Sequence, residues 1–260
     1  MKKELWQERV IELRDLLTRG LVERRESLTE TEMREAAEPL EISALAQAID
    51  HTLLDPFARE EDISRVCAEV AHFGIGAVCL FPCWIPLAKQ IRDELKGTFH
   101  ICVVIDFPGG GELTVTRVKA VENAFKRGCD EVDIVIPLSL FLSGNYMAVL
   151  EDLLAVREAA PGIVKVILEM SRLSPLRKKD AALIAFVSGA DFLKTSTGVN
   201  GKAAEEDVRL LRDLAGKMCG VKAAGGIRSR HEAFSMLKAG ADRIGSSAGP
   251  LLLKEPTLHE

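Results

Sequence analysis

Three charged side chains stand inside apolar segments of this sequence. Asp133 lies in the segment Glu131–Ile136, Lys194 lies in Phe192–Thr195, and Lys222 lies in Gly220–Ala223. Charged groups are almost never fully buried without a partner, so the three side chains could neutralise one another in one site. Buried ion pairs that serve only the fold are the alternative.

A site with two lysines, Lys194 and Lys222, favours chemistry over a purely structural role. Two like charges repel, so a second buried ammonium costs stability. A lysine becomes a nucleophile only after it loses its proton, and burial beside another cation can bring a lysine pKa to about 7–8. The pattern therefore predicts a nucleophilic lysine that a second lysine assists.

Two glycine-rich segments near the end of the chain could hold an anion. One contains Gly225 and Gly226, and the other contains Ser246 and Ser247. Backbone N–H groups need glycine to approach an anion closely, and α/β barrels frequently bind phosphate in the loops after strands seven and eight. The two segments therefore predict a phosphate site.

Short apolar segments that alternate with amphipathic helical stretches must position these residues. Eight of them start 23 to 33 residues apart: Ala48–Leu53, Ala77–Phe81, Ile101–Ile105, Glu131–Ile136, Val164–Leu168, Phe192–Thr195, Gly220–Ala223 and Arg243–Gly245. Each gap holds one predicted helix, such as Val118–Arg127 and Ala203–Lys217. Apolar segments without strict alternation are typical of a parallel sheet covered on both faces.

Eight such units predict an α/β fold, a closed (β/α)8 TIM barrel. The alternative is a doubly wound open sheet, for which we expect a G-x-G-x-x-G motif after the first strand. Residues 50–60 contain no glycine, which favours the barrel. The active site of a barrel lies at the carboxyl ends of its strands. Ten polar residues lie there: Asp50, Thr52, Cys79, Asp133, Lys165, Glu169, Lys194, Thr195, Thr197 and Lys222.

The first 42 residues differ from the rest and predict a helical extension, 1–42, before a barrel domain at 43–260. Apolar residues recur there at helical spacing: Leu5, Trp6, Val10, Leu13, Leu16, Leu17 and Leu21. This stripe needs a surface to cover. The extension either lies on its own barrel or forms a contact between subunits, and the sequence leaves both open.

Composition excludes several classes of protein. The formal net charge is −5, which gives no reason to expect nucleic-acid binding. No apolar stretch approaches the length of about 20 residues that a transmembrane helix needs, and no apolar run near Met1 resembles a signal peptide. Six cysteines without a C-x-x-C pair and five scattered histidines predict a cytoplasmic protein with reduced thiols and no metal site.

The motifs together resemble those of the deoxyribose-phosphate aldolases, a family of class I aldolases. The resemblance covers about residues 43–253 and is carried by Ile49–Leu54, Ala77–Cys79, Asp130–Asp133, Lys165–Glu169, Gly189–Gly198, Val221–Arg228 and Arg243–Ser247. The segments around Lys194-Thr195-Ser196-Thr197-Gly198 and Lys222-Ala223-Ala224-Gly225-Gly226 are the most specific ones.

The resemblance implies a role for each matching residue. Lys194 would form a Schiff base, Lys222 would help it lose its proton, and Asp133 would transfer protons with Lys222 and a water. Lys165 would pair with that carboxylate. The residues implied to bind substrate are Asp50, Thr52, Cys79, Lys165 and Thr197, and those implied to bind phosphate are Gly198, Gly225, Gly226, Ser246 and Ser247.

The implied reaction is the reversible cleavage of 2-deoxy-D-ribose 5-phosphate to acetaldehyde and D-glyceraldehyde 3-phosphate in deoxyribonucleoside catabolism. It needs no cofactor or metal, and the implied partners are small molecules and further copies of the chain in a dimer or tetramer. Two alternatives stay open: a Schiff-base aldolase of another phosphorylated sugar, and a non-catalytic protein that binds a sugar phosphate. Asp106 and Val199 depart from the family pattern, and Tyr146 is the only tyrosine.

Overall fold

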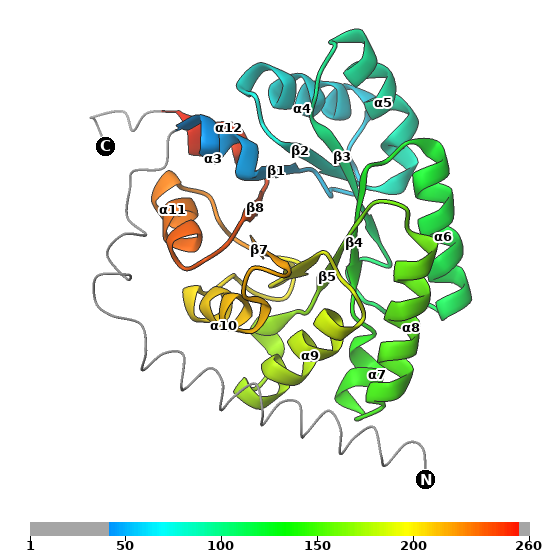
Figure 1. Cartoon of the computed structure of the whole chain (residues 1–260). Helices are drawn as coiled ribbons and strands as arrows, with labels where there is room; N and C mark the ends of the chain where they lie inside the picture. The colour runs from blue at the N-terminus through cyan, green and yellow to red at the C-terminus, as the bar shows by residue number, and fades with distance from the viewer. Residues whose placement is uncertain (1–41, 255–260) are drawn as a thin grey trace.

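Eight parallel strands close into one barrel in the computed structural model, which describes residues 42–254 (Figure 1). The strands are β1 (Ile49–Thr52), β2 (Ala77–Leu80), β3 (His100–Ile105), β4 (Glu131–Val135), β5 (Ile163–Ile167), β6 (Phe192–Lys194), β7 (Gly220–Ala224) and β8 (Arg243–Ser246). Each strand pairs with the next one in the chain, and β8 pairs with β1. The predicted TIM barrel is confirmed, and every strand end lies within one residue of its predicted position.

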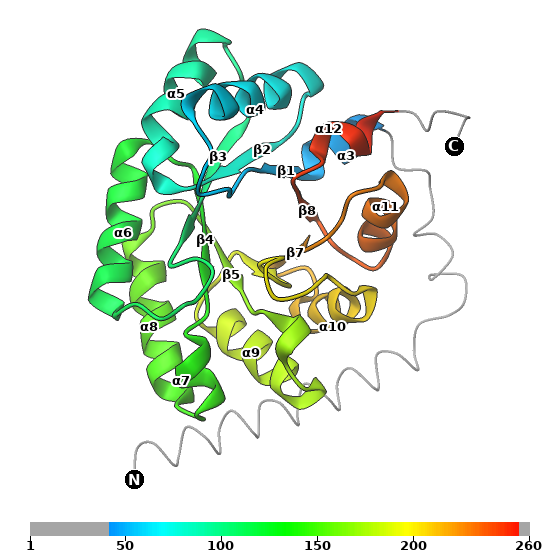
Figure 2. The ribbon, with the colours of Figure 1, turned by 180° about the vertical axis from the view of Figure 1, so that it is seen from behind.

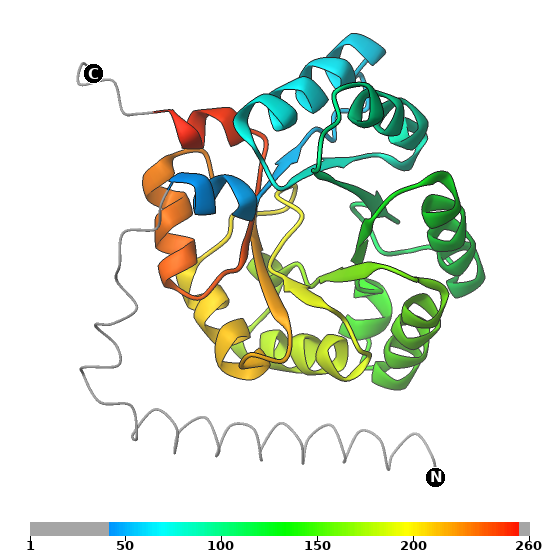
Figure 3. The same cartoon turned by 45° about the horizontal axis from the view of Figure 1, so that its top comes forward.

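Helices surround the barrel on its outer side (Figures 1 and 3). They are α3 (Ile42–Ala48), α4 (Glu60–Phe73), α5 (Ile85–Glu94), α6 (Thr114–Arg127), α7 (Leu138–Leu142), α8 (Tyr146–Ala159), α9 (Pro175–Val187), α10 (Glu205–Ala215), α11 (Arg230–Lys238) and α12 (Gly249–Leu253), with two 3₁₀ turns, η1 (Pro82–Trp84) and η2 (Met170–Arg172). The predicted helices over 118–127 and 203–217 correspond to α6 and α10. No helix within residues 42–254 is long and apolar enough to cross a membrane.

The helix α10 illustrates why these segments become helices that cover the sheet. Its apolar residues Val208, Leu211 and Leu214 recur at helical spacing and are buried. Glu205 and Glu206 stand in its first turn, where acidic side chains interact favourably with the positive end of the helix dipole. The apolar face packs against β7 next to it.

Most of the predicted extension lies outside the described residues. Only Ile42 of that segment is described, and it begins α3, a helix that the sequence analysis did not predict. In α3, Leu45 is fully buried, and the Ala46 carbonyl accepts a hydrogen bond from the Gly76 N–H at 3.0 Å. The helix lies beside α12 in opposite views of the molecule (Figures 1 and 2). The two ends of the described chain therefore meet on one side of the barrel.

The interior of the barrel is charged rather than apolar. TIM barrels are usually filled by layers of branched apolar side chains. Here Asp50, Glu131, Asp133, Lys165 and Lys222 are all fully buried. They come from β1, β4, β5 and β7, so strands far apart in the sequence meet through their charges at the centre of the fold.

Candidate active site

Asp133 on β4 is the centre of the buried charges. Its Oδ2 atom accepts hydrogen bonds from Lys194 Nζ at 2.8 Å and from Lys222 Nζ at 2.7 Å. Its Oδ1 atom accepts from Lys165 Nζ at 2.9 Å. Register explains the meeting, because Asp133 pairs with Lys165 across β4 and β5, and Lys194 pairs with Lys222 across β6 and β7. The structure thus brings together the three residues singled out first from the sequence.

A second tier of charges lies deeper in the barrel. Lys165 Nζ also contacts Glu131 and lies 3.6 Å from Asp50 Oδ2. Arg243 on β8 lies 3.0 Å from Asp50 Oδ1 and 2.8 Å from Glu131 Oε1. Asp50 also forms an ion pair with Lys222. Four cations thus face three carboxylates, so the cluster is neutral when one cation loses its proton.

The pKa shifts show which groups keep their charge. Burial alone raises the pKa of the Asp133 carboxyl, but the charges of the three lysines outweigh burial and hold the pKa well below its usual value. Burial likewise opposes ionisation of Asp50, yet Lys222, Lys165 and Arg243 lower the pKa of Asp50 to about 2. Burial lowers and the carboxylates raise the pKa of Lys222, and the net shift is upward. Lys222 is therefore a fixed cation.

Lys194 differs from the other two lysines of the cluster. Its ammonium has one carboxylate partner among the described residues, Asp133, whereas Lys222 has two and Lys165 has three. Lys165 and Lys222 are fully buried, while Lys194 is 4% exposed and lines a cavity of about 840 Å³. Of the three, Lys194 alone can meet a ligand, and it has the fewest carboxylate partners.

The cavity divides the predicted site residues into two groups. Those that line it with Lys194 are Thr52, Thr197, Gly198, Gly225, Gly226, Ser246 and Ser247. Asp133 and Lys222 do not line it, and neither do three residues that the resemblance assigns to substrate binding, Asp50, Cys79 and Lys165. Those three are fully buried beneath the cavity, where they can act on a ligand only through the residues above them.

Glycine is required where the two phosphate loops meet. Gly225 has φ +118°, and a Cβ atom there would lie 3.0 Å from the Gly201 carbonyl oxygen and 3.4 Å from the Gly198 Cα atom. The Ala203 N–H donates to the Gly225 carbonyl at 2.9 Å. The loop after β6 therefore packs backbone to backbone on the loop after β7, which only glycine allows.

Two cations at the cavity rim, Lys202 and Arg228, were not predicted as site residues from the sequence. Lys202 and Arg228 both line the cavity beside Gly226. The stem of Lys202 lies against Gly226, since a Cβ atom there would come within 2.9 Å of Lys202 Cγ. No carboxylate within residues 42–254 forms an ion pair with either cation. A lysine in a polar loop carries no sequence signal of its own, whereas Arg228 lies two residues after Gly226 and could have been noticed.

Asp106 does not add a free charge to the mouth of the barrel. Its carboxylate accepts from Arg117 Nη1 at 2.6 Å and from the N–H groups of Gly111 and Glu112 at 3.1 and 3.0 Å. Arg117 is fully buried and donates also to the Val135 carbonyl. The aspartate therefore holds the loop after β3 onto α6 and β4.

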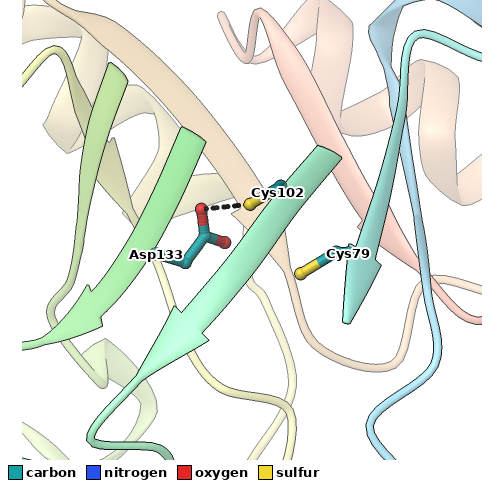
Figure 4. A group of neighbouring side chains, drawn as sticks. All are labelled: Cys79, Cys102 and Asp133. Carbon is teal, nitrogen blue, oxygen red and sulfur yellow. Dashed lines mark hydrogen bonds between the residues drawn. The ribbon is translucent and has the colours of Figure 1, made fainter. Parts of the chain in front are cut away.

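Two buried cysteines lie beside Asp133 (Figure 4). Cys79 and Cys102 pair across β2 and β3, and Cys102 Sγ donates to Asp133 Oδ1 at 3.1 Å. The two sulfur atoms and the carboxylate lie within 4.8 Å of one another, a spacing that could hold a metal ion, and Asp50, Cys102 and Glu131 form a similar group. Both Asp133 oxygens already accept from ammonium groups, however, so a cation would face positive charge.

Comparison with known proteins gives the family. Residues 44–254 match the family described as DeoC/LacD family aldolase. Deoxyribose-phosphate aldolase from Caldanaerobacter subterraneus subsp. tengcongensis is 43% identical over 81% of this chain and 93% of its own length. The enzyme of that name from Thermococcus gammatolerans is 42% identical over 79% of this chain and 93% of its own.

A solved structure agrees with these matches. The tetrameric deoxyribose phosphate aldolase from Aeropyrum pernix superposes with a TM-score of 0.78 and 32% identity, over 85% of this chain and 94% of its own. The chain belongs to the DeoC/LacD family of aldolases and is an enzyme with aldolase activity, a carbon–carbon lyase.

Proposed function

We propose that this aldolase reversibly cleaves 2-deoxy-D-ribose 5-phosphate to acetaldehyde and D-glyceraldehyde 3-phosphate through a Schiff base on Lys194. The observation that carries the proposal is the position of Lys194. Among the three lysines around Asp133, it alone reaches the cavity, and it has a single carboxylate partner. Relatives at about 40% identity bear the name of this activity.

The chemistry begins with the neutral amine of Lys194. Nζ attacks the aldehyde carbon C1 of the open-chain sugar, and the resulting carbinolamine takes up one proton and loses water to give an iminium ion. A base takes the proton of the C3 hydroxyl, the C2–C3 bond breaks, and its electron pair moves to C2 to give an enamine. The C3 carbon leaves as the aldehyde of glyceraldehyde 3-phosphate. Protonation at C2 and hydrolysis then release acetaldehyde and restore the lysine.

The cluster beneath the cavity supports each stage. Lys222, the fixed cation, disfavours a second positive charge on Lys194 before the attack. Asp133 lies 2.8 Å from Lys194 Nζ and 2.7 Å from Lys222 Nζ, so it can pass protons between the two nitrogens and a water in the cavity. The iminium ion is itself the electron sink, so the scheme uses no metal or cofactor.

The rim of the cavity suits a phosphate group. Gly198, Gly225 and Gly226 bring backbone close to the cavity, and Ser246 and Ser247 line it from β8 and the loop after it. Lys202 and Arg228 add two positive charges beside Gly226. In the proposal these groups bind the 5-phosphate, and Thr52 and Thr197 bind the sugar hydroxyls between the phosphate and Lys194.

Two further parts of the proposal concern the whole protein. Five of the six free cysteines are buried thiols, which suits the reducing cytoplasm.

The relative from Aeropyrum pernix is a tetramer, and we propose a homo-oligomer here as well. Sedimentation of the full chain would test this, and a monomer at micromolar concentration would contradict it.

Borohydride trapping tests the proposed mechanism directly. Acetaldehyde and sodium borohydride should attach an ethyl group to Lys194, which peptide mass spectrometry locates. Lys178, which pairs with Asp207 on the outside of the barrel, serves as the control lysine and should stay unmodified. Labelling of Lys222 in place of Lys194 would overturn the assignment of the two lysines. If Lys194 is labelled but the untreated enzyme fails to cleave 2-deoxyribose 5-phosphate, the proposed substrate is overturned.

A further inference from the structure

Glu169 is a buried, strained residue that the proposed mechanism does not use. It lies two residues after the end of β5 and has φ +54° and ψ +46°, the left-handed conformation. A residue other than glycine rarely adopts it, and such positions cluster where a structure needs one particular geometry. Glu169 is 1% exposed.

The carboxylate of Glu169 faces the loop that follows β6. Oε2 accepts from the Thr197 hydroxyl at 2.5 Å and from Asn200 Nδ2 at 3.4 Å. Oε1 accepts from the Thr197 N–H at 3.4 Å and from the Ser171 hydroxyl at 3.5 Å. Within residues 42–254 no cation forms an ion pair with Glu169. Glu169 is therefore an acceptor of hydrogen bonds, and two of these bonds come from Thr197.

These contacts fix the direction of the Thr197 hydroxyl. A hydroxyl has one donor hydrogen and two acceptor lone pairs. The hydrogen of Thr197 goes to Glu169, and one lone pair accepts from the Val199 N–H at 3.1 Å. One lone pair remains, and Thr197 lines the cavity. In this arrangement Thr197 can accept a hydrogen bond from a ligand but cannot donate one.

We propose that Glu169 is a positioning residue, which holds Thr197 as an acceptor and so makes the enzyme prefer substrates with a hydroxyl group at that point. The inference rests on the proposed function. Thr197 stands in the chain between Lys194, which binds the aldehyde carbon, and Gly198 of the phosphate site. In 2-deoxyribose 5-phosphate the C4 hydroxyl, which becomes the 2-hydroxyl of D-glyceraldehyde 3-phosphate, likewise lies between the aldehyde carbon C1 and the phosphate.

The experiment compares two acceptors in the synthetic direction, with acetaldehyde as the other substrate. D-glyceraldehyde 3-phosphate carries the 2-hydroxyl, and 3-phosphooxypropanal lacks it. The measured quantity is the ratio of their kcat/KM values. We expect Glu169→Gln to lower this ratio about tenfold, the range of one hydrogen bond, because the glutamine amide can donate to Thr197 and turn its hydroxyl toward the cavity. Thr197→Val should lower the ratio as far.

Further variants separate positioning from a role in folding alone. The double variant of Glu169→Gln with Thr197→Val should show the ratio of Thr197→Val alone, because both changes remove the same contact. Glu169→Asn suits the left-handed backbone better but is too short to reach Thr197, so it should fold and still lose the preference. Ser171→Ala, the matched control, removes a donor from the other carboxylate oxygen and should keep the ratio within about threefold of wild type.

The outcomes distinguish this inference from the proposed function. A folded Glu169→Gln variant with the wild-type ratio overturns the positioning role, as do equal losses with both acceptors in the Gln and Asn variants. A loss of preference in both variants, with a non-additive double variant, supports it. A wild-type enzyme that forms no product with either acceptor contradicts the proposed function instead.

Discussion

The floor of the cavity, which is the buried cluster around Asp133, and its rim, where Lys202 and Arg228 lie, differ in how their charges are paired. At the floor, Asp133 and Lys222 are fully buried, and every ammonium group has a carboxylate within ion-pair distance. At the rim, Lys202 and Arg228 form no ion pair with any described carboxylate, and glycine backbone does much of the lining. The floor keeps Lys222 as a fixed cation beside Lys194, whereas in the proposed function the rim gains and releases an anion in each turnover.

The difference also explains how each region tolerates change. Removal of one partner from a buried, hydrogen-bonded charge cluster leaves another charge uncompensated, which is strongly destabilising. Removal of an exposed cation leaves no buried charge behind. Substitutions at the floor should therefore affect catalysis and stability together, and those at the rim should affect substrate preference alone.

The largest expected effect comes from Lys222→Leu at the floor. We expect kcat to fall by about 10² to 10⁴, the range for loss of a proton-transfer group, because the fixed cation beside Lys194 and a partner of Asp133 are both lost. Activity should recover in part at high pH, where Lys194 loses its proton without help. The pH–rate profile is the measurement.

Lys178→Met, on the outer surface between α9 and α10, is the matched control for Lys222→Leu and should keep the wild-type profile. A Lys222→Leu enzyme with near wild-type activity and an unchanged profile would reduce Lys222 to a structural ion-pair partner. The floor would then no longer differ from an ordinary buried salt bridge.

A smaller effect is expected at the rim. Lys202→Met and Arg228→Met should each lower, by about tenfold, the ratio of kcat/KM for 2-deoxyribose 5-phosphate to that for 2-deoxyribose, because each removes one charge-assisted contact to phosphate. Lys238→Met, at the exposed end of α11, controls for net charge and should leave the ratio unchanged. Equal kcat/KM values for the two sugars in the wild type would refute the phosphate site itself.

The smallest effect concerns stability in acid. The pKa of Asp50 falls from 3.8 to about 2 in the folded chain, so the unfolded state binds more protons over this interval. The contribution of Asp50 is complete above pH 4 and is lost as pH falls toward 2. Thermal unfolding should show Tm dropping over that window, and less steeply in Asp50→Asn. Identical slopes for both proteins would show that Asp50 does not contribute.

Sequence patterns predicted both the barrel and the three central residues of the floor. The barrel followed from the regular spacing of eight apolar segments. Asp133, Lys194 and Lys222 are charges inside apolar strands, and such charges stand out in a sequence. The contact between Cys79 and Cys102 could not be predicted, because two apolar segments do not reveal which of their positions face each other across β2 and β3. Lys202 is one exposed lysine among many, and only its contact with Gly226 marks it. Helix α3 was not predicted, because it runs directly into β1 and no sequence pattern separates the two elements.

The ion cluster also sets conditions on how the chain folds. Lys222 and Asp50 are 172 residues apart in the sequence, and Arg243 and Glu131 are 112 apart. During synthesis Asp50 on β1 can meet Lys165 of β5 but lacks Lys222 until β7 has emerged, and Glu131 on β4 lacks Arg243 until β8 has emerged. Contacts of such separation form late and slow folding. The charges around Lys194 thus make an unfinished barrel costly, and they favour closure of the ring late in folding.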